Sequence, residues 1–284
     1  MSLRIHLSLL SVLLLNNCNN KKESVATVIN ETVIFETKLS KKIDETSGLE
    51  YFNEGLITHN DSGDDAKLYL FSQTGELLEE FVVNDAVNND WEDIAMDESY
   101  LYIGDSGNNY GNRKNLNIVI TDHLNGFKKM GEINFNYAHQ EDFKSRNKHP
   151  YDAEALIAVD DQLVLFSKNR EELTTELFLI PKQAGDYELT SVRSFDAKAL
   201  ITGGDYNEAL KMVALVGYDR ARNQYLFTLQ NFNLNSLEQV EMIRLELPLK
   251  GKQIEAIKII DANTFWITSE NEDGGYPMLY KVKG

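Results

Sequence analysis

The sequence predicts an all-β fold, a single β-propeller of five blades, and three observations support this prediction. A two-strand unit recurs five times along the 284 residues, each unit opens on a polar or acidic group, and each second strand ends in a polar cluster. Such a repeat indicates an architecture with one structural unit per repeat. The units open at residues 45–49, 91–95, 152–156, 202–206 and 253–257.

The spacing of these openings fits one unit per propeller blade. Glu92 lies 45 residues after Ser47, Glu154 lies 62 residues after Glu92, and Glu255 lies 101 residues after Glu154, which is room for two units. Blades have four strands and about 40–50 residues. The longer interval predicts an insertion, and the polar residues 140–150 have the composition of an exposed loop. A six-bladed ring is the alternative if this insertion contains a degenerate blade.

Short segments within each unit have the composition of strands. β-branched and aromatic residues dominate residues 101–103, 163–166, 225–227 and 264–267. No stretch shows a sustained helical period with caps. We expect the innermost strands to begin near Leu49, Ile94, Leu156, Leu210 and Ile257.

The last unit is one strand short, and this predicts how the ring closes. After Glu270 only residues 278–282 can form a further strand. Residues 32–39, which precede the first unit, also have strand composition. We expect them to pair into the last blade, because this joins the two ends of the ring and covers an exposed strand edge.

Residues 1–17 have the pattern of a lipoprotein signal peptide. Arg4 precedes an apolar run at residues 7–15 that is too short to span a bilayer. Residues 15–18 resemble a bacterial lipobox, and Cys18 is the only cysteine. The alternative is an ordinary signal peptide with an incidental cysteine.

This pattern predicts three regions and a location. We expect residues 1–17 to be removed, residues 18–30 to form a lipidated Cys18 with a polar tether, and residues 31–284 to form the propeller. The protein would then be extracytoplasmic, held at the bacterial outer membrane by its lipid alone.

The charge of the chain restricts its partners. With 45 acidic and 28 basic residues the net charge is −17. This argues against nucleic acid as a partner, because phosphates require a basic surface. It is compatible with a site for a hard cation such as Ca²⁺, which takes oxygen ligands.

The placement of the acids predicts a metal site. In an antiparallel hairpin, the residues before the first strand and after the second lie at the same end, so the polar ends of all units should meet at one mouth of the channel. Carboxylates gathered there repel one another unless a cation is bound. Oxygen donors without a His or Cys cluster predict Ca²⁺, or Mg²⁺. The candidate ligands are Glu92, Asp105, Asn108, Glu154, Asp205 and Glu255.

Basic residues occur in the same polar ends. Lys168, Arg170 and Arg220 are candidates for binding an anion beside the metal. The alternative is that they pair with neighbouring acids and hold the blades together.

Residues 45–49, 59–64, 90–95, 104–109 and 152–156 together resemble a group of secreted bacterial β-propellers. This group is similar to the SdiA-regulated propellers and, more distantly, to the phytase-esterase-like propellers. The resemblance covers nearly all of the chain after the signal peptide and is specific in its first two thirds. It implies a propeller, an extracytoplasmic location and a calcium site, but no settled reaction.

Two functions follow from these expectations. The first is a lipid-anchored, calcium-stabilised binding module for an envelope protein, a glycan or a small anionic ligand, acting as a monomer. The alternative is a metal-dependent hydrolase acting on a phosphate ester or a lactone. In that case Glu154 would be the general base, and Lys168 with Arg170 would hold the anionic end.

Overall fold

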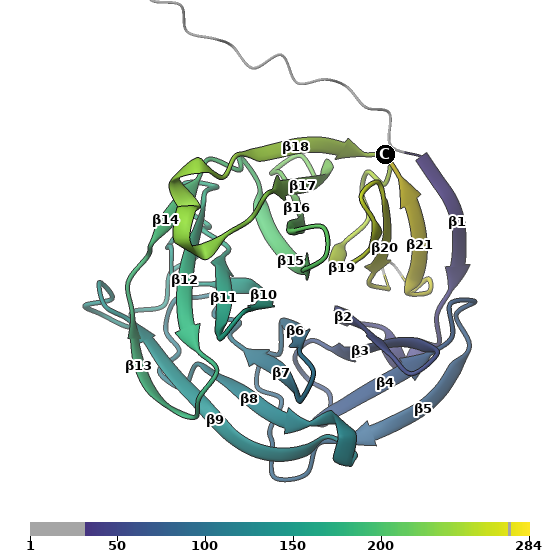
Figure 1. Ribbon diagram of the computed structural model, residues 1–284, viewed down its shortest axis with the longest axis horizontal. Coiled ribbons are helices and arrows are strands. Elements are labelled where there is room, and N and C mark those ends of the chain that lie inside the picture. Colours follow the sequence, from purple (N-terminus) through teal and green to yellow (C-terminus); the bar gives the residue numbers. More distant parts are fainter. Residues whose placement is uncertain (1–31, 272–273) are drawn as a thin grey trace, which may run out of the picture.

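Strand pairing divides the described part of the chain, residues 32–271 and 274–284, into five sheets. The computed structural model arranges these sheets as blades around a central channel (Figure 1). Four sheets have four strands and one has five. The predicted five-bladed propeller is therefore confirmed, and residues 140–150 form a loop without strands.

Four blades run outward from the channel in chain order. Blade 1 contains β2 (Thr46–Phe52), β3 (Gly55–Asn60), β4 (Lys67–Phe71) and β5 (Leu77–Val82). Blade 2 contains β6 (Asp93–Met96), β7 (Tyr100–Asp105), β8 (Asn117–Asp122) and β9 (Lys128–Tyr137). Blade 3 contains β10 (Ala153–Val159), β11 (Gln162–Ser167), β12 (Thr175–Pro181) and β14 (Arg193–Phe195). Blade 4 contains β15 (Leu200–Asn207), β16 (Met212–Tyr218), β17 (Gln224–Gln230) and β18 (Met242–Leu247).

Blade 5 closes the ring with strands from both ends of the chain. It contains β19 (Ile254–Asp261), β20 (Thr264–Ser269), β21 (Met278–Lys283) and β1 (Thr32–Lys38). β1 is antiparallel to β21, and its Lys38 lies opposite Met278. Val33 and Phe35 of β1 pack against the core while Ile34 between them is exposed, the alternation expected of an edge strand. The predicted closure is therefore confirmed.

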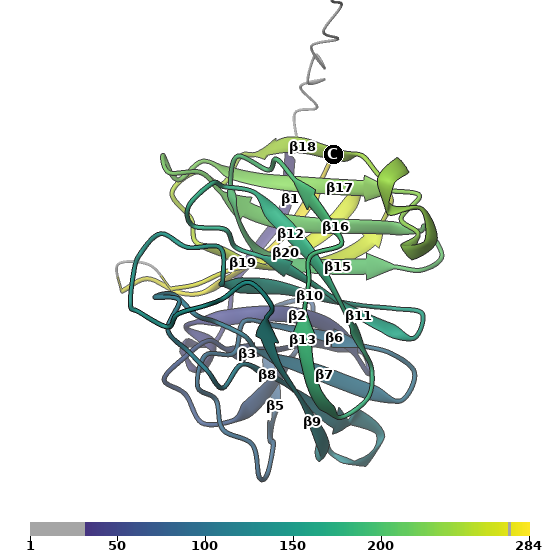
Figure 2. The ribbon, with the colours of Figure 1, turned by 90° about the vertical axis from the view of Figure 1, so that its left-hand side faces the viewer.

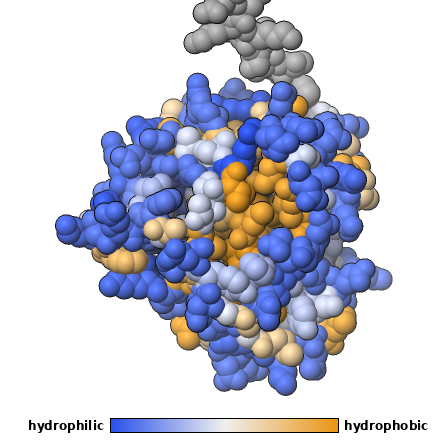
Figure 3. Space-filling view, turned by 60° about the vertical axis from the view of Figure 1, so that its left-hand side comes forward, coloured by the Kyte–Doolittle hydropathy of each residue, from blue (hydrophilic) through white to orange (hydrophobic). Residues whose placement is uncertain are grey.

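One strand departs from this plan. After β12 the chain leaves blade 3, and β13 (Gly185–Leu189) pairs parallel with β9 of blade 2 (Figure 2). The chain then returns as the short β14, whose pairing with β12 extends only from Thr175 to Leu177. On this side of the molecule, Figure 3 shows an apolar area framed by hydrophilic residues.

The innermost strands begin where the sequence predicts in four blades. Leu49, Ile94, Leu156 and Ile257 lie in β2, β6, β10 and β19. The expectation for Leu210 is wrong, because this residue lies in the turn after β15 and is 40% exposed.

The innermost strand of blade 4 is β15, which ends before Leu210 and contains Gly203 and Gly204. A Cβ on Gly203 would lie 2.5 Å from the carbonyl oxygen of Glu255 in the neighbouring blade. Glycine is needed there because two innermost strands approach closely.

The apolar core lies between adjacent blades. Phe166 of β11 and Phe227 of β17 belong to one buried cluster that joins blades 3 and 4. Trp91 is fully buried between blades 1 and 2, where its ring meets His59 edge-on at 5.7 Å. No helix in the described ranges is long and apolar enough to cross a membrane.

Two carboxylates connect the innermost strands across the channel. Asp93 accepts hydrogen bonds from the backbone N–H groups of Ile94, Leu156 and Gly204 at 2.9, 2.9 and 3.0 Å, and so connects blades 2, 3 and 4. Burial raises the pKa of Asp93, and these N–H bonds oppose that rise.

Asp205 completes this arrangement on the other side of the channel. Its carboxylate accepts from the backbone N–H of Ile259 and from Lys258 Nζ, both at 2.7 Å, and Lys258 also pairs with Glu50. Blades 4, 5 and 1 are thereby connected.

Asp93→Ala should destabilise the protein strongly, because three buried N–H groups would lose their common acceptor. Each unsatisfied buried group costs about 1–3 kcal/mol, so the free energy of unfolding should fall by roughly 3 kcal/mol or more. Urea denaturation measures this, with the exposed Asp196→Ala as control. Equal stability of the two variants would contradict the bridging role.

Candidate metal centre at the channel mouth

Acidic side chains from the first three blades meet at one mouth of the channel. Asp61 follows β3, while Asp90 with Glu92 and Asp152 with Glu154 stand at the starts of β6 and β10. They form two groups, Asp61–Asp90–Glu92 and Glu92–Asp152–Glu154, which share Glu92. In each group, one carboxylate oxygen from each residue lies within 4.8 Å of the oxygens offered by the other two. Either group has the donors to hold a metal ion.

A local backbone feature positions part of this mouth. The ladder register shifts at Glu154 in β10, at Thr202 in β15 and at Glu255 in β19. Such bulges place one unpaired residue in the strand and redirect its side chain. Glu154, Thr202 and Glu255 therefore occupy equivalent positions.

Asp205, in contrast, stands three residues deeper in β15 than this position. At the mouth, the residue that blade 4 contributes is therefore Thr202. Its hydroxyl donates a hydrogen bond to the carbonyl oxygen of Ile254 at 2.7 Å.

Two of the three carboxylates in the second group, Asp152 and Glu154, are neutralised by cations of the protein. Lys168 Nζ pairs with Glu154, and Arg170 pairs with Asp152 at 2.6 Å and with Glu154 at 3.2 Å. All four side chains are largely or fully buried. Two carboxylates therefore face two cations, and this half of the mouth has little remaining charge to offer a metal ion.

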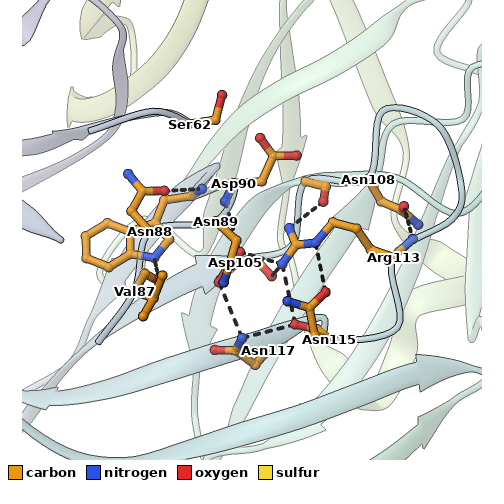
Figure 4. Close-up of polar contacts among 12 residues, drawn as sticks. Ser62, Val87, Asn88, Asn89, Asp90, Asp105, Asn108, Arg113, Asn115 and Asn117 are labelled. Atoms are coloured by element: carbon orange, nitrogen blue, oxygen red, sulfur yellow. Dashed lines mark hydrogen bonds and ion pairs between the residues drawn. The ribbon is translucent and has the colours of Figure 1, made fainter. Parts of the chain in front are cut away.

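The first group lacks such partners. Within the described ranges, no lysine or arginine forms an ion pair with Asp61, Asp90 or Glu92. In Figure 4, Arg113 contacts Asp105, whereas the carboxylate of Asp90 carries no contact to the residues drawn. The charges of Arg113 and Lys168 therefore lower the pKa values of Asp90 and Asp61 only from a distance, and burial still leaves both pKa values raised.

Burial, more than any other cause, raises the pKa values of these acids. The pKa of Asp61 rises to about 8, first through burial and then through the charges of Asp90 and Glu255. Burial, then the charge of Glu154, raises the pKa of Glu92 well above its usual range. The nearby Glu270 reaches a pKa of about 9, through burial and the charge of Glu255. A divalent cation would displace the protons that these groups otherwise retain.

Gly107 gives the first group its shape. A Cβ at this position would overlap with carboxylate oxygens of both Glu92 and Asp90. Its carbonyl oxygen accepts a hydrogen bond from Arg113 at 2.6 Å, which fixes the loop. The backbone at residue 107 therefore leaves room for two carboxylates to approach each other.

Two of the sequence-predicted ligands support this loop. Asp105 pairs with Arg113 at 2.7 Å and accepts from the side chain of Asn89 at 2.5 Å. Asn108 donates to the carbonyl oxygen of Tyr151 at 2.7 Å and accepts from the N–H of Arg113 at 2.9 Å. Their polar atoms are engaged beside the acid groups rather than within them.

The remaining predicted residues are distributed as follows. Glu92 and Glu154 belong to the acid groups, and Glu255 is buried close enough for its charge to raise the pKa of Asp61. Glu255 itself has a pKa raised to about 7 by burial. Arg220 is exposed and contacts the carbonyl oxygen of Glu171 at 3.4 Å, apart from the acids.

Three members of the acid groups were not among the predicted ligands: Asp61, Asp90 and Asp152. Asp90 and Asp152 could have been recognised from the sequence. Each stands two residues before a predicted ligand, Glu92 or Glu154. In extended chain, residues two apart point to the same side. The repeated Asp-x-Glu spacing therefore marks both pairs.

Comparisons with known proteins show the fold and no family. No family model matches the sequence, and no curated protein matches it. The sequence resemblance to the SdiA-regulated and phytase-esterase-like propellers thus has no support from sequence matches.

Solved structures with a similar fold include two enzymes. An exo-β-1,3-galactanase from Phanerochaete chrysosporium, bound to β-1,3-galactotriose, has a TM-score of 0.52 at 10% identity over 89% of this chain and 64% of its own. A glucose dehydrogenase has a TM-score of 0.50 at 10% identity over 88% of this chain and 99% of its own. A chain of a mitotic checkpoint complex has a TM-score of 0.47 at 10% identity, over 98% and 99%. This chain spans less than two thirds of the galactanase, and such low identity shows the fold alone.

The metal-free protein should lose stability as the pH rises. An acid whose pKa is raised in the folded state stabilises the fold while it is protonated, and this contribution is lost as pH passes the folded-state pKa. With Glu255, Asp61 and Glu270 at about 7, 8 and 9, the free energy of unfolding should fall between about pH 5 and pH 9.

Chemical denaturation across this range, with a chelator present, measures the effect. Asp61→Asn should flatten the fall, whereas the exposed Asp196→Asn should not. A metal-free stability that rises over this window would contradict the raised pKa values.

Proposed function

We propose that this protein is a calcium-binding β-propeller whose channel mouth binds an envelope protein, a glycan or a small anionic ligand. One observation carries the proposal: Asp61, Asp90 and Glu92 bring their oxygens within 4.8 Å without a cation of the protein, directly beside a similar group that has two. Because the first group lacks the ion pairs that its neighbour has, we infer that it binds a metal cation from solution.

The donor set favours Ca²⁺. Three carboxylates can supply up to six oxygens, mono- or bidentate, and Ca²⁺ takes six to eight oxygen ligands in flexible geometry. Mg²⁺ requires nearly ideal octahedral geometry, and zinc prefers nitrogen and sulfur. Asp61 and Asp90 are half-buried, so water or a ligand could complete the coordination from the open side.

A bound Ca²⁺ would also give the mouth its binding property. It would cancel much of the repulsion among Asp61, Asp90 and Glu92 and leave open positions toward solvent. Hydroxyl groups of a glycan, a carboxylate or a carbonyl oxygen are the groups that such positions accept.

A metal-dependent hydrolase for phosphate esters or lactones is the second candidate, supported by Lys168 and Arg170 in the same mouth. Lys168 is bound to Glu154, and Arg170 to Asp152 and Glu154. An anionic substrate would have to displace these carboxylates, and Glu154 has both oxygens engaged before it can act as a base. The binding module therefore ranks first.

For the location, we propose that Cys18 anchors the propeller outside the cytoplasm, at the bacterial outer membrane. The support is the sequence pattern before Cys18. These residues lie outside the part of the chain that the structure describes.

Removing the metal should destabilise the protein, and Glu92 should be required for this response. A native-state ligand adds about 2.7 kcal/mol at 100 times its Kd, so the melting temperature should rise with Ca²⁺ and fall with a chelator. Glu92→Gln should lose most of the rise, because it removes one of the three carboxylates of the first acid group.

The control for this experiment is Glu188→Gln, an exposed glutamate on β13, which should respond as wild type does. A melting temperature indifferent to Ca²⁺ and chelator would refute the metal site. The same preparations should show no turnover of phosphate esters or lactones; chelator-sensitive turnover would favour the hydrolase.

Cys18→Ser should release the protein from the membrane fraction or leave the signal peptide uncleaved. Fractionation of cells expressing wild type and variant measures this. Unchanged membrane association of the variant would contradict the lipid anchor.

A further inference from the structure

The loop that connects blades 2 and 3 packs against the loop that shapes the first acid group. The former, which we call the connecting loop, contains residues 140–150, and the latter, the β7–β8 loop, contains residues 106–116. Gly107 of the β7–β8 loop has its backbone against the carboxylates of Asp90 and Glu92. The contacts between the two loops therefore bear on where these carboxylates lie.

Two hydrogen bonds from the connecting loop hold the tip of the β7–β8 loop. The backbone N–H of Arg146 donates to the carbonyl oxygen of Tyr110 at 2.9 Å. The side-chain amide of Gln140 donates to the carbonyl oxygen of Gly111, also at 2.9 Å. The connecting loop thereby fixes a segment of the preceding blade.

His149 makes a third contact, from the interior of the protein, where it is only 1% exposed. Its Nδ1 accepts from the backbone N–H of Tyr151 at 3.1 Å, so the ring proton is on Nε2. Nε2 then donates to the carbonyl oxygen of Asn109 at 3.2 Å. A Cβ on Gly111 would lie 2.9 Å from Cγ of the same ring, so the backbone of the β7–β8 loop packs directly on the imidazole.

The contact at Asn109 is two residues from the acid group. Gly107 donates its N–H to the carbonyl oxygen of Asp90 at 3.2 Å. A side chain on Gly107 would overlap with the carboxylates of Asp90 and Glu92, so both carboxylates pack against this stretch of backbone. A shift of Asn109 would therefore move the surface against which they are placed.

We propose that His149 is a positioning residue of the metal site, and that the connecting loop sets the affinity of this site for its cation. This inference rests on the metal site proposed for Asp61, Asp90 and Glu92. His149 does not coordinate the ion but acts through the backbone of Asn109. Carboxylates bind a cation well when their supporting groups hold them in place beforehand, and loss of such a support lowers metal affinity by roughly 10- to 100-fold.

Isothermal titration calorimetry with Ca²⁺ on three variants of His149 tests this role. His149→Ala should weaken Ca²⁺ binding roughly tenfold. His149→Gln keeps an N–H near the position of Nε2 that can reach Asn109, so it should recover most of the affinity. His149→Asn can replace only the acceptor for Tyr151, so it should bind Ca²⁺ as weakly as His149→Ala. This order separates the contact with the β7–β8 loop from a general loss of packing.

Hydrogen exchange of the metal-free protein gives a second readout. The amide of Gly107 should exchange faster in His149→Ala than in wild type, because the loop that carries it is released, and His149→Gln should restore its protection. The matched control is His139→Ala, an exposed histidine one residue before the connecting loop, which should change neither the affinity nor the exchange. Thermal unfolding confirms that each variant is folded.

Equal Ca²⁺ affinity in wild type and His149→Ala would overturn the proposal, as would a recovery in His149→Asn as large as in His149→Gln. A wild-type protein that binds no Ca²⁺ would refute the metal site itself. Hydrogen exchange at Gly107 would then still decide whether His149 positions the β7–β8 loop, so the two failures are distinguishable.

Discussion

The five innermost strands converge on an axis where their backbone groups cannot pair as they do within a blade, and two carboxylates resolve this constraint. Asp93 accepts three N–H groups from blades 2, 3 and 4, and Asp205 with Lys258 connects blades 4, 5 and 1. These contacts hold the openings of the blades in a common register. The position of every acid at the mouth depends on that register.

The convergence of the innermost strands also gives the channel mouth two parts that differ in charge compensation. Lys168 and Arg170 compensate Asp152 and Glu154, so that half is an internal ion-pair network. The pKa values of Asp61, Asp90 and Glu92 are raised, so these groups either retain protons or are neutralised by a bound cation. Buried ion pairs are seldom strong stabilisers in themselves, but they can set where unbalanced charge remains. In this protein that place is the first acid group.

Most of the fold and part of the candidate metal site could be predicted from the sequence repeat. Unit spacing predicts the five blades and the closing strand, because each is a property of local pattern. Asp205 could not be placed, since the bulge position that Glu154 occupies in β10 is occupied in β15 by Thr202, three residues before Asp205. The sequence also could not show that Lys168 forms its ion pair with Glu154, or that β13 pairs with β9 of blade 2. Both contacts depend on how segments distant in the sequence pack together.

The most direct test of the account is the location of a bound ion. Anomalous diffraction from crystals grown with Ca²⁺ should place one peak among the carboxylates of Asp61, Asp90 and Glu92, with Lys168 still on Glu154. The absence of a peak there, or a peak between Asp152 and Glu154 with Lys168 displaced, would contradict the claim that uncompensated charge selects the metal site.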